Sequence, residues 1–222
     1  MCHINAEGIH IKMGLTYFGS LPIHSKQEYK FYLNADEIAL GISDRPWKRI
    51  KSRFLNPIWK YERMLRRAEY YTNCKRYGFC RPLSILMRLR AYRYGYKLGF
   101  EIPVNVFGAG LSIAHHGSII VNPYAKVGEN CRIHNSVTIG TEAGYGDKSP
   151  TIGDNVFIGP GVQIFGRITI ANDIAIGANS VVNKSFLESG ITIGGVPAKK
   201  ISDKGSQAIF GRPTELLRRK SP

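Results

Sequence analysis

Aliphatic residues recur every six positions through most of the second half of the chain. The register consists of two blocks, Val121, Val127, Ile133 and Ile139 in the first, and Ile152, Ile158, Ile164, Ile170 and Ile176 in the second. A helix, with a period of about 3.6 residues, cannot produce this spacing, and a β-sandwich would show turns at wider intervals. Each hexad therefore predicts one short strand followed by a corner.

A second set of small or aliphatic side chains lies four residues after most of these positions. Its members are Ala125, Cys131, Val137, Val156, Val162, Ile168, Ile174 and Ser180. Gly and Asn recur beside them, and both tolerate the positive φ of tight corners. Three hexads form one triangular coil, and stacked coils bury each other's apolar faces. The sequence thus predicts a mainly β protein, a parallel β-helix in which Cys131 is a core residue rather than a nucleophile.

The six-residue register is interrupted at two places. At one of them the spacing is seven residues too long, and the polar, Gly-rich stretch of residues 141–150, which contains this excess, predicts a loop that projects from a rigid scaffold. At the other, two extra residues fall around His115, His116 and Gly117. A side chain at such an interruption need not pack inside the coil.

Residues 1–100 show a different pattern, and we expect them to be mostly helical. Apolar residues recur at helical spacing in Ile58–Cys74. A second stretch, Leu83–Lys97, is apolar on one side and basic on the other, and Gly99 follows it as a helix C-cap would. We therefore divide the chain into a helical region over residues 1–100, a β-helix over 101–202 and a C-terminal tail.

The chain has 222 residues and a net charge of +15, and most of this charge lies in the helical region. Residues 1–100 carry 19 Lys and Arg against seven Asp and Glu. The tail, residues 203–222, is basic as well. Such a balance suits either an anionic partner or a solvated surface. Three roles remain open for the helical region: capping the β-helix and helping it trimerise, docking on an anionic membrane, and binding nucleic acid, which is disfavoured because no nucleic-acid module is recognisable.

The four cysteines show no spacing typical of a disulfide framework. Met1–Gly14 lacks the charged start and apolar run of a signal peptide. We therefore expect reduced thiols in a cytoplasmic protein, with peripheral contact at the inner face of the membrane as an open alternative. No pair of Cys or His has metal-ligand spacing, so no metal is expected.

Four features together resemble a known enzyme family. They are the hexapeptide run, the segment from Leu111 to Val121, the loop before Thr151-Ile152-Gly153, and the closing Gly194-Gly-Val-Pro-Ala-Lys-Lys200. Over roughly residues 95–202 the chain resembles the serine acetyltransferase group of hexapeptide acyltransferases. More narrowly, it resembles members that acetylate sugars in capsule and exopolysaccharide pathways. The resemblance implies a left-handed β-helix, acetyl-CoA as co-substrate and a homotrimer with active sites between neighbouring β-helices.

The resemblance also implies a general base. The family motif of an aliphatic residue, a variable residue and His maps onto Ile113-Ala114-His115. A hydroxyl is a weak nucleophile at neutral pH, and a positioned imidazole can take its proton during attack on the thioester. Glu101 matches, with a one-residue gap and an Asp-to-Glu change, the family residue that orients this imidazole. His116 is a candidate for contact with the substrate, and His134 is expected to be a surface histidine.

Further positions follow from the same resemblance. The substrate loop of serine acetyltransferases carries a basic residue, His and Pro, and here Lys148 keeps the charge while Ser149 replaces the histidine. Backbone groups next to the corner glycines are expected to contact the pantetheine arm of CoA, and Lys199 and Lys200 suit its phosphates. The expected cofactor-binding residues are Gly159, Pro160, Ala178, Lys199 and Lys200.

The leading functional expectation is acetyl transfer from acetyl-CoA to a sugar hydroxyl of a cell-surface polysaccharide or its precursor, with a saccharide as the acceptor. One alternative is a serine O-acetyltransferase of cysteine biosynthesis, against which Ser149 counts. Another is a β-helix scaffold without catalytic activity, against which His115 counts.

Overall fold

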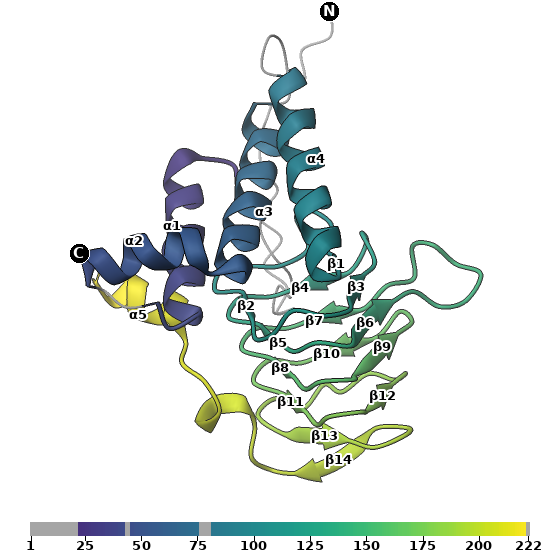
Figure 1. The fold of residues 1–222 in the computed structure, drawn as a ribbon. Helices are drawn as coiled ribbons and strands as arrows, with labels where there is room; N and C mark the ends of the chain where they lie inside the picture. The colour runs from purple at the N-terminus through teal and green to yellow at the C-terminus, as the bar shows by residue number, and fades with distance from the viewer. Residues whose placement is uncertain (1–21, 43–44, 76–80, 221–222) are drawn as a thin grey trace, which may run out of the picture.

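The computed structural model describes residues 22–42, 45–75 and 81–220. Part of the cytoplasmic expectation rests on residues outside these ranges, namely Met1–Gly14, Cys2 and Cys80. Helices gather at one end of the molecule, above a stack of short strands, and the C-terminal segment returns from the far end of the stack towards the helices (Figure 1).

Fourteen short strands form three sheets in the described part of the chain. The first sheet has the order β1-β3-β6-β9-β12, the second β10-β7-β4 and the third β14-β13-β11-β8-β5-β2. Their bounds are β1 Phe100–Glu101, β2 Ser112–Ile113, β3 Ile119–Val121, β4 Lys126–Val127, β5 Arg132–Ile133, β6 Val137–Gly140, β7 Thr151–Ile152, β8 Phe157–Ile158, β9 Gln163–Phe165, β10 Thr169–Ile170, β11 Ala175–Ile176, β12 Val181–Val182, β13 Thr192–Gly194 and β14 Lys199–Ser202.

From β2 to β12 the chain visits the third, first and second sheets in rotation, so it winds as a three-sided coil. All strand pairs are parallel except β13 with β14. In the third sheet, Ile113, Ile133, Ile158 and Ile176 stand opposite one another in successive coils. The two hexad sets predicted to lie inside the coil are buried, at 8% exposure or less, so the predicted interior is confirmed.

The corners have the backbone that the Gly and Asn pattern predicts. Asn130, Asn155 and Asn179 have φ between 54° and 57°, in the left-handed region. Gly159 is needed for a different reason, because a Cβ there would lie 2.9 Å from the backbone of the next coil. Residues 141–150 leave the coil between β6 and β7 as the expected loop, on the right in Figure 1.

The helices are α1 (Lys26–Ala39), α2 (Pro46–Leu55), α3 (Pro57–Cys74), α4 (Arg81–Leu98) and α5 (Pro213–Lys220). The two predicted helical stretches correspond to α3 and α4, and Gly99 has a φ of 83° at the end of α4. The helices α1 and α2 lie in the region expected to be mostly helical but were not predicted individually, and α5 was not predicted at all. No helix in the described ranges is both long and apolar enough to cross a membrane.

The helical region covers the open end of the coil. Tyr61 and Leu65 of α3 are buried in the same core as the coil interior, and the Tyr61 ring contacts Phe100 at 5.0 Å between centroids. Backbone N–H groups of the first coil have no further coil to pair with, and buried helix carboxylates accept them. Asp36 accepts from Gly110 and Leu111 at 2.8 and 2.9 Å. These bonds satisfy amides that would otherwise be buried without a partner.

Two more carboxylates of α3 bind the same coil. Glu62 accepts the Ile113 N–H at 3.1 Å, and Glu69 accepts the Asn105 N–H at 2.9 Å. The guanidinium of Arg66 lies among the acidic groups and is completely buried. The cap is therefore fixed to the coil by charged side chains as well as by apolar packing.

The expectation of a basic C-terminal tail needs a correction. Residues 205–218 run back along the corner between the second and third sheets and dock there. Thr214 is buried and exchanges hydrogen bonds with Asn130 at 2.8 and 3.1 Å. Arg218 pairs with Glu129, and Arg212 with Asp173. The positive charges of this segment are thus partly matched by carboxylates at the coil corner, which composition alone could not reveal.

Candidate active site

His115 lies at the corner where the chain passes from the third sheet to the first. We call this the His115 corner, and its residues are 114–118, 134–136, 159–162 and 177–180. Pro160 and Ala178 stand two residues after paired isoleucines, as His115 does, so the three positions stack along one corner. All three are exposed. The structure therefore aligns the predicted base with two positions expected to contact CoA.

The spacing along this corner follows from the coil. Successive coils are about 4.8 Å apart, so Pro160 lies about 10 Å and Ala178 about 14 Å from the level of His115. Gly159 precedes Pro160, and the backbones of neighbouring coils approach closely there because no Cβ intervenes. We call the row of stacked positions His115, Asn135, Pro160 and Ala178 the track of this corner.

His115 contacts a second histidine that the sequence analysis undervalued. The rings of His115 and His134 meet edge to face, 5.6 Å between centroids, and His134 contacts Phe157 at 5.1 Å on its other side. His134 is half-buried rather than a free surface residue, and its Nε2 is buried without a partner among the described residues. Burial, followed by the charges of Arg132 and His115, lowers the pKa of His134.

The neutral form of His134 is therefore favoured at neutral pH. A neutral ring against His115 does not add a positive charge beside the base. The six-residue register could have identified His134 from the sequence. It places His134 one coil below Ala114, next to the interruption that contains His115.

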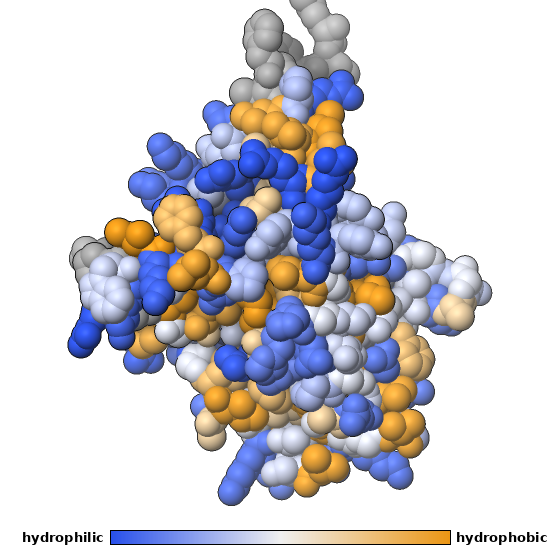
Figure 2. Space-filling view, viewed as in Figure 1, coloured by the Kyte–Doolittle hydropathy of each residue, from blue (hydrophilic) through white to orange (hydrophobic). Residues whose placement is uncertain are grey.

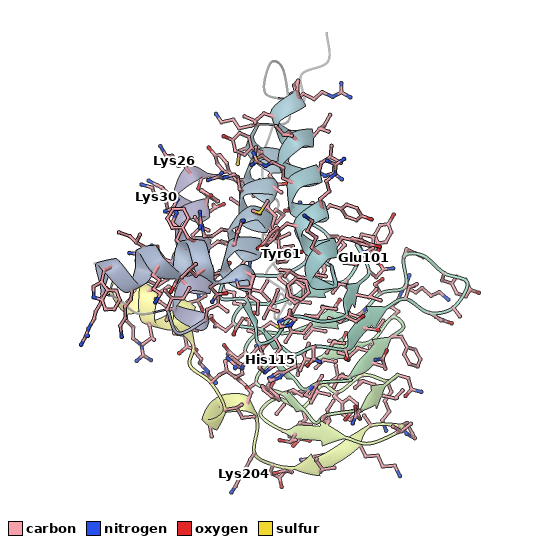
Figure 3. All side chains as sticks on the ribbon, viewed as in Figure 1. Lys26, Lys30, Tyr61, Glu101, His115 and Lys204 are labelled. Atoms are coloured by element: carbon pink, nitrogen blue, oxygen red, sulfur yellow. The ribbon has the colours of Figure 1, made fainter. Side chains whose placement is uncertain are left out.

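Glu101 lies on β1, opposite Ile120 of the first sheet, and its side chain is exposed. Figure 3 shows it near the base of α4, apart from His115. Among the described residues His115 has no side-chain hydrogen bond, so the expected bond from Glu101 is not formed within this chain. The match of Glu101 to the family residue required a one-residue gap in the alignment. In a strand, a shift of one residue moves the side chain to the opposite face, which explains why Glu101 does not point to His115.

The loop residues lie at a different corner. Residues 141–150 connect the first sheet to the second, whereas His115 lies between the third and the first. The Lys148 Nζ lies 3.2 Å from a carboxylate oxygen of Glu142, and Ser149 is buried and donates its hydroxyl to Asn122 at 2.8 Å. One chain therefore does not bring Lys148 or Ser149 to His115. His116 is exposed beside His115.

The two C-terminal lysines differ in their surroundings. Both are exposed on β14, and Lys199 pairs with Gly194, one residue after the paired Ile193. Lys199 therefore continues the track of the His115 corner beyond Ala178. Lys200 instead pairs with Glu188 and with Asp203 at 2.5 and 2.6 Å. Hydrogen bonds to Asp203 and Glu188 raise the pKa of Lys200.

Other reactive groups do not gather near this site. Cys131 is buried, as expected for a core residue, and burial raises the pKa of its thiol, so it is not a reactive thiolate. In the described ranges, no cluster of three or more His, Cys, Asp or Glu side chains could hold a metal ion.

A comparison with models of known protein families found no match. Comparison with individual proteins found serine acetyltransferases. The chain is 39% identical over 135 residues to that of Mycobacterium tuberculosis, covering 60% of this chain and 58% of the relative. It is 34% identical over 128 residues to that of Helicobacter pylori strain J99, covering 57% of this chain and 70% of the relative. The chain thus spans less than two thirds of the Mycobacterium protein.

Solved structures give the same result. A serine acetyltransferase from Brucella abortus strain S19 in complex with coenzyme A superimposes with a TM-score of 0.61 and 25% sequence identity, covering 81% of this chain and 70% of that one. The superposition extends past the repeat into the helical region, because the coil provides fewer residues than are matched. With 34% identity over more than two thirds of a curated relative, this chain belongs to the serine acetyltransferase family.

Proposed function

We propose that this protein transfers the acetyl group of acetyl-CoA to the hydroxyl of serine, with His115 as the general base. The observation that carries the proposal is the alignment of an exposed imidazole with an exposed track of corner positions, in a chain of the serine acetyltransferase family. The CoA complex of the Brucella enzyme supports acetyl-CoA as the donor.

The acceptor is a correction of the sequence-based expectation. A saccharide hydroxyl in capsule or exopolysaccharide synthesis was the leading expectation, mainly because Ser149 replaces the histidine of the family loop. The relatives found by comparison are named serine acetyltransferases, which contradicts that expectation and favours the alternative. Ser149 is engaged with Asn122, so its replacement of a histidine is weak ground for a different acceptor class.

The chemistry needs a single proton acceptor at the hydroxyl. His115 takes the proton as the serine oxygen attacks the thioester carbonyl, and the C–S bond then breaks to release CoA, whose sulfur receives a proton. An exposed imidazole suits this role near neutral pH. The neutral His134 ring limits the directions in which the His115 ring can turn, which favours a fixed orientation for proton transfer.

The track at the His115 corner supports the proposed place of the pantetheine arm. With the thioester at His115, the arm would pass Pro160 and Ala178 and reach Lys199, whose ammonium is a point charge suited to a phosphate. Lys200 is a weaker candidate for that contact because two carboxylates already hold it. We also propose that the coil winds left-handed, as the resemblance to the family implies.

A homotrimer would complete the site. His115 and the loop of residues 141–150 occupy different corners of the triangular coil in one chain. If the His115 corner of one chain lies against the loop corner of the next, the two parts meet, and a three-fold arrangement closes without free ends. Lys148 would then lie near a substrate held by the neighbouring chain's imidazole, whereas Ser149, which is buried against Asn122, would support the loop from behind.

The acceptor is tested by thiol release from acetyl-CoA with L-serine, a panel of monosaccharides and oligosaccharides, and no acceptor. We expect serine to give the largest kcat/KM and background release to be low. Efficient release with a saccharide and none with serine would overturn the proposed acceptor while leaving the acetyl donor in place. No release with any acceptor would overturn the proposed activity as a whole.

A further inference from the structure

A cavity lies among the helices of the cap, away from the His115 corner. It has a volume of about 220 Å³ and lies between α2, α3 and α4. Its lining residues are Arg53, Phe54, Lys60, Arg63, Met64, Arg67, Met87 and Arg90. Five of these eight residues are cationic and none is acidic. Figure 2 shows hydrophilic and hydrophobic side chains side by side over this part of the molecule.

The cations of the cavity are not balanced by nearby carboxylates. Among the described residues, none of the five forms an ion pair. Glu37 lines an adjacent cavity with three of the same arginines and acts on Arg63 in the opposite sense to the neighbouring arginines, but it is itself paired with Arg49. The cost of gathering like charges is visible at Arg63, where partial burial and then the charges of Arg53 and Arg67 lower the pKa.

Two of the five cations, Arg63 and Lys60, make contacts that restrict their side chains, whereas Arg53, Arg67 and Arg90 are exposed. Arg63 is half-buried and donates from Nη1 to the Arg53 carbonyl oxygen at 3.1 Å. The Lys60 ammonium lies 4.7 Å from the centre of the Tyr94 ring. Met64 and Met87 form an apolar, half-buried floor. The two restricted cations lose less side-chain entropy when an anion binds beside them, which favours binding in this cavity.

The size and chemistry of the cavity restrict the ligand. Pockets for drug-sized molecules measure about 300–1,000 Å³, so this cavity suits a smaller group. Planar guanidinium groups bind phosphoryl oxygens in pairs, and several of them match a group with more than one negative charge. We propose that the cavity between α2, α3 and α4 binds a phosphoryl-bearing anion, either a free phosphorylated compound or the headgroup of an anionic lipid.

The test is a calorimetric titration of the full chain with inorganic pyrophosphate at a constant ionic strength of about 0.15 M. We expect saturable binding that weakens about tenfold or more in the double variant Arg63→Gln/Arg67→Gln. The matched control is Lys26→Gln/Lys30→Gln, which removes the same charge from exposed positions on α1, labelled in Figure 3. The control should change affinity less than about twofold.

Equal weakening in both double variants, or no saturable binding to the wild-type chain, would overturn the proposal. Circular dichroism of each variant guards against a loss of fold. A single variant, Arg90→Gln on α4, offers a second route, because that residue is exposed and should weaken binding without disturbing the core.

Vesicles distinguish the two sources of the anion. If phosphatidylglycerol vesicles bind the chain, pyrophosphate displaces it from them, and the Arg63→Gln/Arg67→Gln variant binds them less, the cavity receives a lipid headgroup. If pyrophosphate binds but vesicles neither bind nor compete, the ligand is a free phosphorylated compound. Neither result depends on acetyl transfer, so failure of this proposal and failure of the proposed activity are distinguishable.

Discussion

Arg66 is the side chain on which the junction between the cap and the coil depends most. It is completely buried and makes five hydrogen bonds. Two go to Asp36 at 2.7 and 3.3 Å and one to Glu69 at 2.9 Å. The other two go to the carbonyl oxygens of Phe107 and Gly108 at 2.8 and 2.6 Å. Arg66→Met keeps an apolar stem of similar length and removes all five.

The expected cost can be worked from these contacts. Removing one partner of a buried ion pair destabilises a protein by about 3–5 kcal/mol, because the remaining charge stays buried without compensation. Two buried carbonyl groups also lose their donor, at about 1–3 kcal/mol each when no water replaces it. These terms are not additive, and we expect Arg66→Met to lower the free energy of unfolding by about 4–6 kcal/mol at pH 7.

Urea unfolding followed by circular dichroism measures this loss. Arg67→Met is the matched control, since Arg67 is the next residue of α3 and is exposed, and its effect should stay within about 0.5 kcal/mol. The loss for Arg66→Met should shrink at pH 5, where the remaining carboxylates are more easily protonated. A loss below about 1 kcal/mol at pH 7 would show that the buried cluster does not hold the cap on the coil.

Two further predictions concern stability. Burial, followed by the charge of Asp36, raises the pKa of Glu62 well above its usual range. The contribution of Glu62 to stability is therefore complete below its pKa in the unfolded chain, and it is lost as the pH rises through its pKa in the folded protein. Glu62→Gln, which can still accept the Ile113 N–H, should therefore unfold at the same urea concentration as wild type near pH 4 and at a higher one near pH 9; a lower midpoint at pH 9 would refute this sign. Ile158→Ala should cost about 2–5 kcal/mol in urea unfolding, and Leu187→Ala, at a site 75% exposed, less than about 1 kcal/mol; similar costs would contradict the assigned interior.

The coil could be predicted from the sequence because its physics is periodic. Each inward position has the same requirement, an aliphatic side chain above and below, so the six-residue register identifies Ile133 or Ile158 without knowledge of the rest. The interruption at His115 was detectable for the same reason. The loop of residues 141–150 was also predictable, as an excess over the register.

The cap was only partly predictable, because its contacts join residues far apart in the chain. Asp36 accepts the Gly110 N–H across 74 positions, and no local pattern indicates that a carboxylate of α1 will meet the first coil. Buried charges also oppose the usual expectation that acidic residues lie at the surface. The docking of Thr214 against Asn130 was missed in the same way, since composition suggested only a basic tail.

Within the candidate site, the sequence located single residues better than their relations. His134 was expected to be a surface histidine, because outward-facing positions of the coil show no repeating residue type from which a contact could be predicted. The bond expected between Glu101 and His115 depended on an alignment shifted by one residue, and in the structure Glu101 lies on the first sheet. The separation of His115 from Ser149 required the sheet order, which strand spacing alone does not provide.

The most direct test of the account measures the formation of O-acetylserine from acetyl-CoA and L-serine by mass spectrometry, for wild type, His115→Ala and His116→Ala. His116, the adjacent exposed histidine and a candidate for substrate contact, is the comparison, because the proposal assigns the proton transfer to His115 alone. We expect wild type to form O-acetylserine, His115→Ala to be slower by about 10²-fold or more, and His116→Ala to stay within a few-fold of wild type. Absence of O-acetylserine with wild type, or full activity in His115→Ala, would contradict the account.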